Sequence, residues 1–317
     1  MARQPDLTVV VPVFNESALF AELHARVSAA LAKTGRPAEI IYVDDGSSDG
    51  TLDLIRAVAA RDAGVRFLSF SRNFGHQTAV SAGIENASGR LVLVMDGDLQ
   101  DPPELIPEFL KLHEAGAEVV YAVRRKRKEG ALLKFCYRLF YRFLAGVSDI
   151  RIPRDSGDFC LMDERVVRVL KRMPERRRFV RGIRAWAGFR QVPLEYERDR
   201  RFAGEAKYNL ARLVRLAIDG ISDFSDFPLR LCAYLGYAMA GVSMAGLLYS
   251  VASKLIYDRT PQGWTSTTIA IFFIGGVQLV MLSVVGGYVG RIYTEVKQRP
   301  LYVVKESNFE LSGPNAL

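Results

Sequence analysis

Two long stretches without a charged side chain, residues 231–253 and 266–290, constrain this chain more than any other feature. As helices, both are long enough to cross the ~30 Å hydrocarbon core of a membrane. Buried core helices of soluble proteins seldom avoid charge over so many residues, so we favour two transmembrane helices. The short polar loop between them contains Pro261 and Gly263, which predicts a hairpin with both chain ends on one side of the membrane.

The remainder of the chain is predicted to stay in the cytoplasm. Its first apolar run, residues 7–14, is too short for a signal peptide. A net charge of +8 agrees with retention beside anionic headgroups. The three cysteines form neither a zinc spacing nor a disulfide framework, which fits a reducing compartment. We therefore expect four parts: a folded domain (1–204), an interfacial linker (205–228), the transmembrane pair (229–292) and a cytoplasmic tail (293–317).

The folded domain has the pattern of an α/β protein. Short apolar runs at 7–13, 39–43, 67–70 and 91–95 alternate with helical periodicity at 17–33 and 51–61. Such alternation predicts a mostly parallel sheet covered by helices, with ligands bound at the carboxyl ends of the strands. The glycine-rich phosphate loops of dinucleotide-binding and P-loop proteins are absent from the sequence, so a nucleotide would be held in another way.

Acidic clusters follow two of the predicted strands. Asp96, Asp98 and Gln100 lie on one short turn, and their hard oxygen ligands suit Mg²⁺ or Mn²⁺. Asp44 and Asp45 lie at another strand-to-helix turn, where one carboxylate could accept hydrogen bonds from a base. Aspartate is also common in turns and caps for structural reasons, so each cluster alone is ambiguous.

A basic stripe lies on an apolar helical segment, residues 131–147. Lys134, Arg138 and Arg142 recur every four residues there, which places the three cations near one face of an amphipathic helix at the membrane interface. A solvated or headgroup-attracted basic face is the alternative. The three histidines, including His76, show no ligand spacing, and we expect them to have surface or packing roles.

Five motifs, in order, carry a specific resemblance. They are Val11-Pro12-Val13-Phe14-Asn15-Glu16, Val43-Asp44-Asp45-Gly46-Ser47, Ser71-Arg72-Asn73-Phe74-Gly75, Met95-Asp96-Gly97-Asp98-Leu99-Gln100-Asp101-Pro102-Pro103 and Ser156-Gly157-Asp158-Phe159. With them the chain resembles the polyprenyl-phosphate glycosyltransferases, which are inverting family-two enzymes of the GT-A fold. The two apolar C-terminal helices look most like those of the bactoprenol glucosyltransferases. The resemblance implies a Rossmann-like nucleotide-sugar domain, interfacial amphipathic helices and a two-helix transmembrane hairpin.

The resemblance also implies roles for individual residues. The residues implied to bind the nucleotide sugar are Pro12, Phe14, Glu16, Asp44, Asp45, Asp96, Arg201 and Lys207. The residues implied to bind the metal are Asp96, Asp98 and Gln100. Arg124 and Arg138 align with arginines that grip the lipid phosphate, and Lys134 and Arg142 share their stripe. The chain departs from the family at Phe14, where tyrosine is common, and at Ala206, where serine is usual.

The expected reaction is the transfer of a hexose, with inversion, from UDP-glucose to undecaprenyl phosphate at the bacterial plasma membrane. Asp98 and Asp158 are the candidate catalytic residues, and Asp158 acts either as a base or as an orienting group. The alternatives are a GDP-mannose-dependent mannose synthase, a processive polysaccharide synthase, disfavoured because the sequence has no Gln-x-x-Arg-Trp motif, and a non-catalytic nucleotide-sugar or lipid-binding protein. Membrane lipids are expected partners, nucleic acid is not, and a homo-oligomer is compatible with the resemblance.

Overall fold

The computed structural model describes residues 5–124, 156–196 except 174 and 177, 227–257 and 263–311. These residues belong to two compact units, which are considered separately. The first, here called the sheet unit, holds the described residues before 197 together with 299–311. The second, here called the helical unit, holds residues 227–257 and 263–298.

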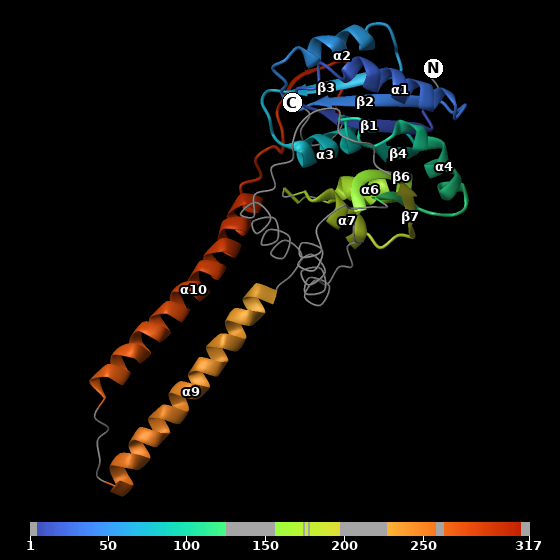
Figure 1. Ribbon diagram of the computed structural model, residues 1–317. Helices are drawn as coiled ribbons and strands as arrows, with labels where there is room; N and C mark the ends of the chain where they lie inside the picture. The colour runs from blue at the N-terminus through green and yellow to red at the C-terminus, as the bar shows by residue number, and fades with distance from the viewer. Residues whose placement is uncertain are drawn as a thin grey trace. The chain divides into compact units, whose positions relative to one another are not determined.

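The sheet unit is built on one mixed sheet of eight strands in the order β7-β5-β6-β4-β1-β2-β3-β8 (Figure 1). The strands are β1 (Leu7–Val13), β2 (Ala38–Asp44), β3 (Val65–Phe70), β4 (Leu91–Val94), β5 (Val119–Arg124), β6 (Ser156–Asp163), β7 (Gln191–Tyr196) and β8 (Val304–Ser307). The helices are α1 (Phe20–Ala32), α2 (Thr51–Ala59), α3 (His76–Asn86), α4 (Ile106–Glu114) after the 3₁₀ turn η1 (Pro103–Leu105), α6 (Glu164–Arg172) and α7 (Val180–Trp186).

The centre of the sheet is parallel, as the sequence predicts. Strands β4, β1, β2 and β3 all run in one direction, and β1 is buried along its whole length. Burial on both faces explains why its residues are apolar in an unbroken run rather than in alternation. Antiparallel strands then extend the sheet, because β6 pairs with β4 and β8 pairs with β3. The result is an α/β fold with a mixed sheet, as expected from the GT-A resemblance.

Two apolar cores cover the two faces of the sheet. Val9 and Val11 of β1 point into the core that contains α1 and α4, whereas Val10 points into the core that contains α3, α6 and α7. Helix α3 lies so close to the sheet that a Cβ on Gly83 would be 2.1 Å from a Val10 methyl group. The missing side chain of Gly83 therefore allows the close approach that brings the first turn of α3 to the end of β1.

The C-terminal segment completes one edge of the sheet. Residues 304–307, inside the predicted tail 293–317, form β8 against β3. The Asn308 side chain accepts a hydrogen bond from the Phe67 backbone at 2.8 Å and donates to the Val65 carbonyl at 3.0 Å. Tyr302 is 1% exposed and donates to Glu85 at 2.9 Å. The chain thus leaves the described sheet after β7 at one edge and returns to it at the opposite edge.

The helical unit consists of α9 (Phe227–Tyr257) and α10 (Trp264–Val296), which run antiparallel and contact one another (Figure 1). Both predicted apolar spans are therefore helical. Within the described residues, one segment, Phe273–Val296, is long and apolar enough to cross a membrane, with a mean hydropathy of 1.7 and 0% of it buried. The apolar segment in α9, Leu231–Gly246, is shorter.

Candidate functional site

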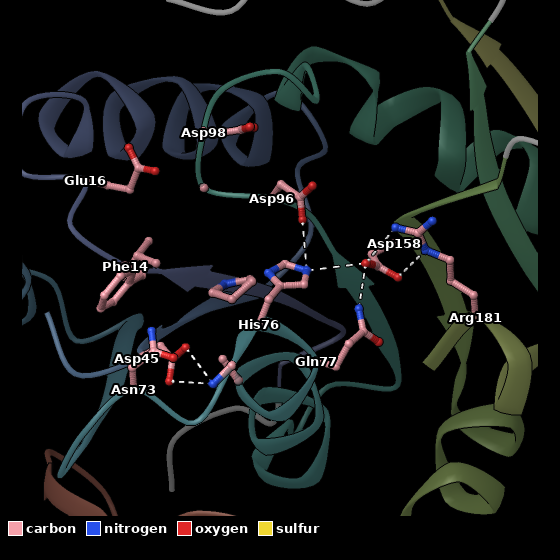
Figure 2. A pocket seen from close by; sticks show the side chains of 15 residues that line it. Phe14, Glu16, Asp45, Asn73, His76, Gln77, Asp96, Asp98, Asp158 and Arg181 are labelled. Carbon is pink, nitrogen blue, oxygen red and sulfur yellow. Dashed lines mark hydrogen bonds and ion pairs between the residues drawn. The ribbon is translucent and has the colours of Figure 1, made fainter. Parts of the chain in front are cut away.

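A cavity of about 540 Å³ opens at the carboxyl ends of the central strands (Figure 2). Its lining residues are Pro12, Val13, Phe14, Glu16, Asp45, Asn73, Gly75, His76, Gln77, Ala79, Asp96, Gly97, Asp98, Asp158 and Arg181. Most follow β1, β2, β3 or β4 directly, because parallel neighbours end at the same edge of a sheet.

Asp158 reaches the cavity from an antiparallel strand. Val94 of β4 pairs with Cys160 of β6. In that register, the residue two positions after Val94 lies opposite the residue two positions before Cys160, and these two residues are Asp96 and Asp158. The start of β6 therefore lies beside the end of β4, and the topology brings together two carboxylates that are 62 positions apart in the sequence.

The turn after β4 is tightly constrained. A Cβ on Gly97 would be 2.8 Å from the Pro12 carbonyl oxygen, and Leu99 has a φ of 57°, which is rare for a side-chain-bearing residue. Among the described residues, the buried atoms Asp96 Oδ1 and Gln100 Oε1 have no hydrogen-bond partner. Burial and the charge of Asp101 raise the pKa of Asp96 to about 6. Unsatisfied buried oxygens of this kind are the groups that a cation would satisfy.

His76 lies between two carboxylates. Its Nε2 is 3.4 Å from Asp96 Oδ1 and 3.3 Å from Asp158 Oδ2. Although burial alone would lower the pKa of His76, the hydrogen bond to Asp158 and the charge of Asp96 raise it. One ligand atom from each of these three residues lies within 4.8 Å of the others, so they form a second group that could hold a metal ion.

Asp158 is enclosed by donors. Arg181 Nε lies 2.7 Å from Oδ1, and Arg181 Nη2 and Gln77 Nε2 lie 3.0 Å and 2.9 Å from Oδ2. Burial alone would raise the pKa of Asp158, but the contacts with His76 and Arg181 hold it well below its usual range. The carboxylate is therefore ionised and positioned by several contacts (Figure 2).

The other end of the cavity combines an aromatic ring with an amide and a carboxylate. Phe14 is 44% exposed, and Figure 2 shows Asp45 and Asn73 near it. The Asp45 carboxylate accepts hydrogen bonds from the backbone N–H groups of Phe74, at 2.6 Å, and Gly75, at 3.0 Å. Burial raises the pKa of Asp45, and these two bonds oppose the shift. A flat, exposed ring beside fixed polar groups is suited to a stacked base.

The structure brings together seven of the sequence-predicted site residues. Pro12, Phe14, Glu16, Asp45, Asp96, Asp98 and Asp158 all line the cavity. Asp44 is buried outside it and accepts hydrogen bonds from Ser69 and from the Ser47 backbone. Gln100 is also buried, and its backbone N–H donates to Asp98. Arg124 is the last residue of β5, whereas Lys134, Arg138, Arg142, Arg201 and Lys207 lie outside the described residues.

Other residues of the cavity were missed or left open by the sequence. His76, for which the sequence predicts a surface or packing role, has a 44%-exposed side chain that also contacts two site carboxylates. Asn73 belongs to a motif used for the family resemblance, and His76 and Gln77 follow that motif directly. Nearness to the motif was the available signal for this pair. Arg181 belongs to a sequence cluster of arginines (Arg176, Arg177, Arg178, Arg181 and Arg184) whose partner the sequence does not specify, and its distance from the other motifs gave no signal.

Comparison with known proteins identifies the family of this chain. The model of the family described as glycosyl transferase family 2 matches residues 8–170. A Bacillus subtilis protein named as the uncharacterized glycosyltransferase YkcC is 44% identical, with 97% of this chain and 95% of that protein covered. The SfII prophage-derived bactoprenol glucosyl transferase of Shigella flexneri is 40% identical, with 95% of this chain and 98% of that protein covered.

A solved structure also resembles this chain. It is the mannosyltransferase PcManGT of Pyrobaculum calidifontis in complex with GDP-Man and Mn²⁺, at 15% identity and a TM-score of 0.46, with 89% of this chain and 88% of that chain covered. The family model matches more than half of the chain, and the relatives align over nearly its whole length. The protein is therefore a transferase and belongs to glycosyl transferase family 2.

Proposed function

We propose that this protein transfers glucose from UDP-glucose to a polyprenyl phosphate, undecaprenyl phosphate in a bacterial membrane. Relatives at 38–40% identity over most of the chain are named as bactoprenol glucosyl transferases or a homologue of them, which supports both the sugar and the class of acceptor. UDP-glucose as the donor rests on the family resemblance.

The observation that carries the proposal is the division of charge within one cavity. Asp96 and Asp98 lie on the turn after β4, whereas His76, whose pKa is raised by Asp158 and Asp96, and the cation Arg181 lie on α3 and α7. A donor diphosphate and an acceptor phosphate repel one another, so a site that joins them needs positive charge near both. The basic residues Arg124, Lys134, Arg138 and Arg142 are proposed to bind the acceptor phosphate in addition.

The residues present fit a divalent cation. Asp98 and Gln100, with Asp96 beside them, offer the oxygen ligands that Mg²⁺ and Mn²⁺ prefer, and two buried oxygens of this turn accept no hydrogen bond from the described residues. When bound there, a cation would offset the charge that builds up on the leaving diphosphate. We propose Asp96, Asp98 and Gln100 as its ligands, as the resemblance implies.

The chemical step is a direct displacement. An oxygen of the acceptor phosphate forms a bond to the anomeric carbon of glucose, and the bond from that carbon to the diphosphate breaks with its electron pair, so the configuration inverts. A phosphate monoester is largely ionised at neutral pH and needs no strong base. Asp158, ionised and enclosed by donors, is proposed to orient neighbouring groups rather than to take a proton.

The base is proposed to bind beside Phe14, Asp45 and Asn73, with Pro12 and Glu16 completing this part of the site and Arg201 and Lys207 approaching the diphosphate. Asp44, which is buried outside the cavity, is proposed to act only by holding the turn after β2 through Ser47. The exposed ring of Phe14 supplies a stacking surface, without the hydroxyl that a tyrosine would add.

Helices α9 and α10 are proposed to form a transmembrane hairpin (229–292). Large apolar side chains of α10 such as Phe273 and Leu279 are 64% and 69% exposed, which a lipid environment would cover. Residues 1–204 are proposed as the cytoplasmic catalytic domain, residues 205–228 as an interfacial linker and residues 293–317 as the returning tail. Such an anchor would keep the enzyme at the surface where its lipid acceptor resides.

Incubating the purified chain with undecaprenyl phosphate and a panel of radiolabelled nucleotide sugars, with and without Mg²⁺, Mn²⁺ or a chelator, tests the proposal. We expect labelled lipid from UDP-glucose, abolished by the chelator. Labelled lipid from GDP-mannose alone would show that the donor is GDP-mannose rather than UDP-glucose. The absence of lipid product from every donor would refute the proposed function.

A further inference from the structure

Both ends of the Gln77 side-chain amide are engaged in the wall of the cavity. Nε2 donates to Asp158 Oδ2 at 2.9 Å, and Oε1 accepts from the Val180 backbone N–H at 3.0 Å. Because the two ends of an amide differ in polarity, these contacts fix its orientation. Val180 is the first residue of α7, and Arg181 follows it. One uncharged side chain on α3 thus connects the start of β6 to the start of α7.

The same carboxylate holds Arg181 on its other side. Asp158 Oδ1 accepts from Arg181 Nε at 2.7 Å, and Oδ2 accepts from Nη2 at 3.0 Å and from Gln77. Arg181 and Asp158 therefore form a closed loop with Gln77, which binds the carboxylate directly and the arginine through the backbone of its helix. Loss of the amide would leave the ion pair and the His76 contact intact but would remove the one α3 side chain among the described residues that contacts both Asp158 and the backbone of α7.

The Gln77–Asp158–Arg181 contacts lie beside the groups that are proposed to act in the transfer reaction. Asp158 lies beside Asp96 across the β4–β6 register, and His76, the residue before Gln77, approaches both carboxylates. A small displacement of the Asp158–Arg181 pair would move opposite charges within the cavity where the two anionic substrates are proposed to meet. Misplacement of about 1 Å at a reacting centre costs a large factor in rate.

We propose that Gln77 is a positioning residue for the transfer reaction: it fixes the Asp158–Arg181 pair relative to α3 and so sets the direction in which the pair faces the substrates. This inference rests on the proposed transfer to a polyprenyl phosphate and assigns a role to a residue outside the charged groups of the site. The role is exerted through Asp158 and α7.

Steady-state kinetics of two variants of the full-length chain test the inference. Gln77→Glu preserves size and an acceptor for the Val180 N–H, but it turns a carboxylate oxygen toward Asp158. Gln77→Met preserves approximate length and removes both contacts. The matched control is Gln191→Met: Gln191 Nε2 donates to the Arg184 carbonyl of the same helix at 3.0 Å, and Gln191 is not among the residues that line the cavity.

We expect both Gln77 variants to lower kcat about tenfold or more, with KM for the nucleotide sugar within about twofold of the wild-type value, and Gln191→Met to retain the wild-type kcat. Thermal melting is recorded in parallel. Unchanged kcat in folded Gln77 variants, or an equal loss in Gln191→Met, would overturn the positioning role. If Gln77→Met does not fold, Gln77→Glu decides by the same criteria. Absence of lipid product in the wild type would instead refute the proposed function, and the inference with it.

Discussion

Arg181 and Asp158 form a bidentate ion pair in which the guanidinium Nε and Nη2 lie 2.7 Å and 3.0 Å from the two carboxylate oxygens. The carboxylate is 2% exposed, whereas the guanidinium side chain is 35% exposed. The pair therefore has a buried acidic end and a partly solvated basic end. A carboxylate held in this way is a weak proton acceptor, and its value to the site lies in holding a cation at the cavity wall.

Replacing Arg181 with alanine removes the main partner of a buried carboxylate. We expect Arg181→Ala to lower the free energy of unfolding by about 1–3 kcal/mol, less than for a fully buried pair because the arginine is partly solvated. Denaturation of the detergent-solubilised chain measures this loss. The control is Arg168→Ala, which breaks an exposed pair with Glu164 and should cost under about 0.5 kcal/mol. Equal losses in the two variants would contradict the assigned burial.

Asp98 is the proposed metal ligand that is most easily tested. We expect Asp98→Ala to abolish lipid glycosylation and to weaken Mn²⁺ binding at least about tenfold, because a carboxylate oxygen is lost from the turn after β4. Titration calorimetry with Mn²⁺ and the radiolabel assay measure the two effects separately. The control is Asp53→Ala in α2, whose 75%-exposed carboxylate pairs with Arg56 outside the cavity. Mn²⁺ affinity unchanged in Asp98→Ala would remove Asp98 from the site.

The parallel centre of the sheet was predictable because its signals are local. The apolar run 7–13 coincides with β1, and Asp45 and Asp96 follow β2 and β4 as the strand-end rule requires. The helix predicted at residues 17–33 begins instead at Phe20, because residues 14–17 form a loop in which the Glu16 backbone N–H donates to Thr51. Such ties to another segment are not visible in helical periodicity.

The rest of the cavity depends on contacts between segments far apart in the sequence. Arg181 and His76 meet Asp158 only because β6 pairs antiparallel with β4 and α3 approaches the sheet at Gly83. Single-sequence patterns carry no signal for such pairings. Strand β8 was missed for the same reason, since residues 304–307 (Val-Lys-Glu-Ser) hold one apolar side chain and show no alternation that would indicate a strand without β3 beside them.

Arg138 lies outside the described residues, so its proposed role is tested by kinetics. We expect Arg138→Ala to raise KM for undecaprenyl phosphate about tenfold while KM for the nucleotide sugar stays near the wild-type value, because a phosphate-binding guanidinium contacts only the acceptor. Arg61→Ala, an exposed arginine that does not line the cavity, controls for the loss of one positive charge. Equal lipid KM values in Arg138→Ala and Arg61→Ala would reduce the role of Arg138 to general attraction to the membrane.

Glu39 makes the stability of the sheet unit depend on pH. This 6%-exposed carboxylate accepts hydrogen bonds from Thr8 at 2.6 Å, from Ser88 at 2.7 Å and from Arg66 at 2.9 Å. Burial alone would raise the pKa of Glu39, but these bonds lower it below its usual value. A carboxyl whose pKa is lower in the folded than in the unfolded chain stabilises the fold above the unfolded pKa, about 4.3, and this stabilisation is lost as the pH falls through the folded pKa.

We therefore expect Glu39→Gln to lower the free energy of unfolding by about 1.5–3 kcal/mol at pH 7, because an amide cannot accept from donors on both sides. The difference between wild type and variant should shrink as the pH falls below about 4, where the wild-type carboxyl takes up a proton. Glu164→Gln, with a 53%-exposed side chain, should have little effect at either pH. A difference between wild type and Glu39→Gln that stays constant from pH 7 to pH 3 would show that the lost stability comes from packing rather than from the charge of Glu39.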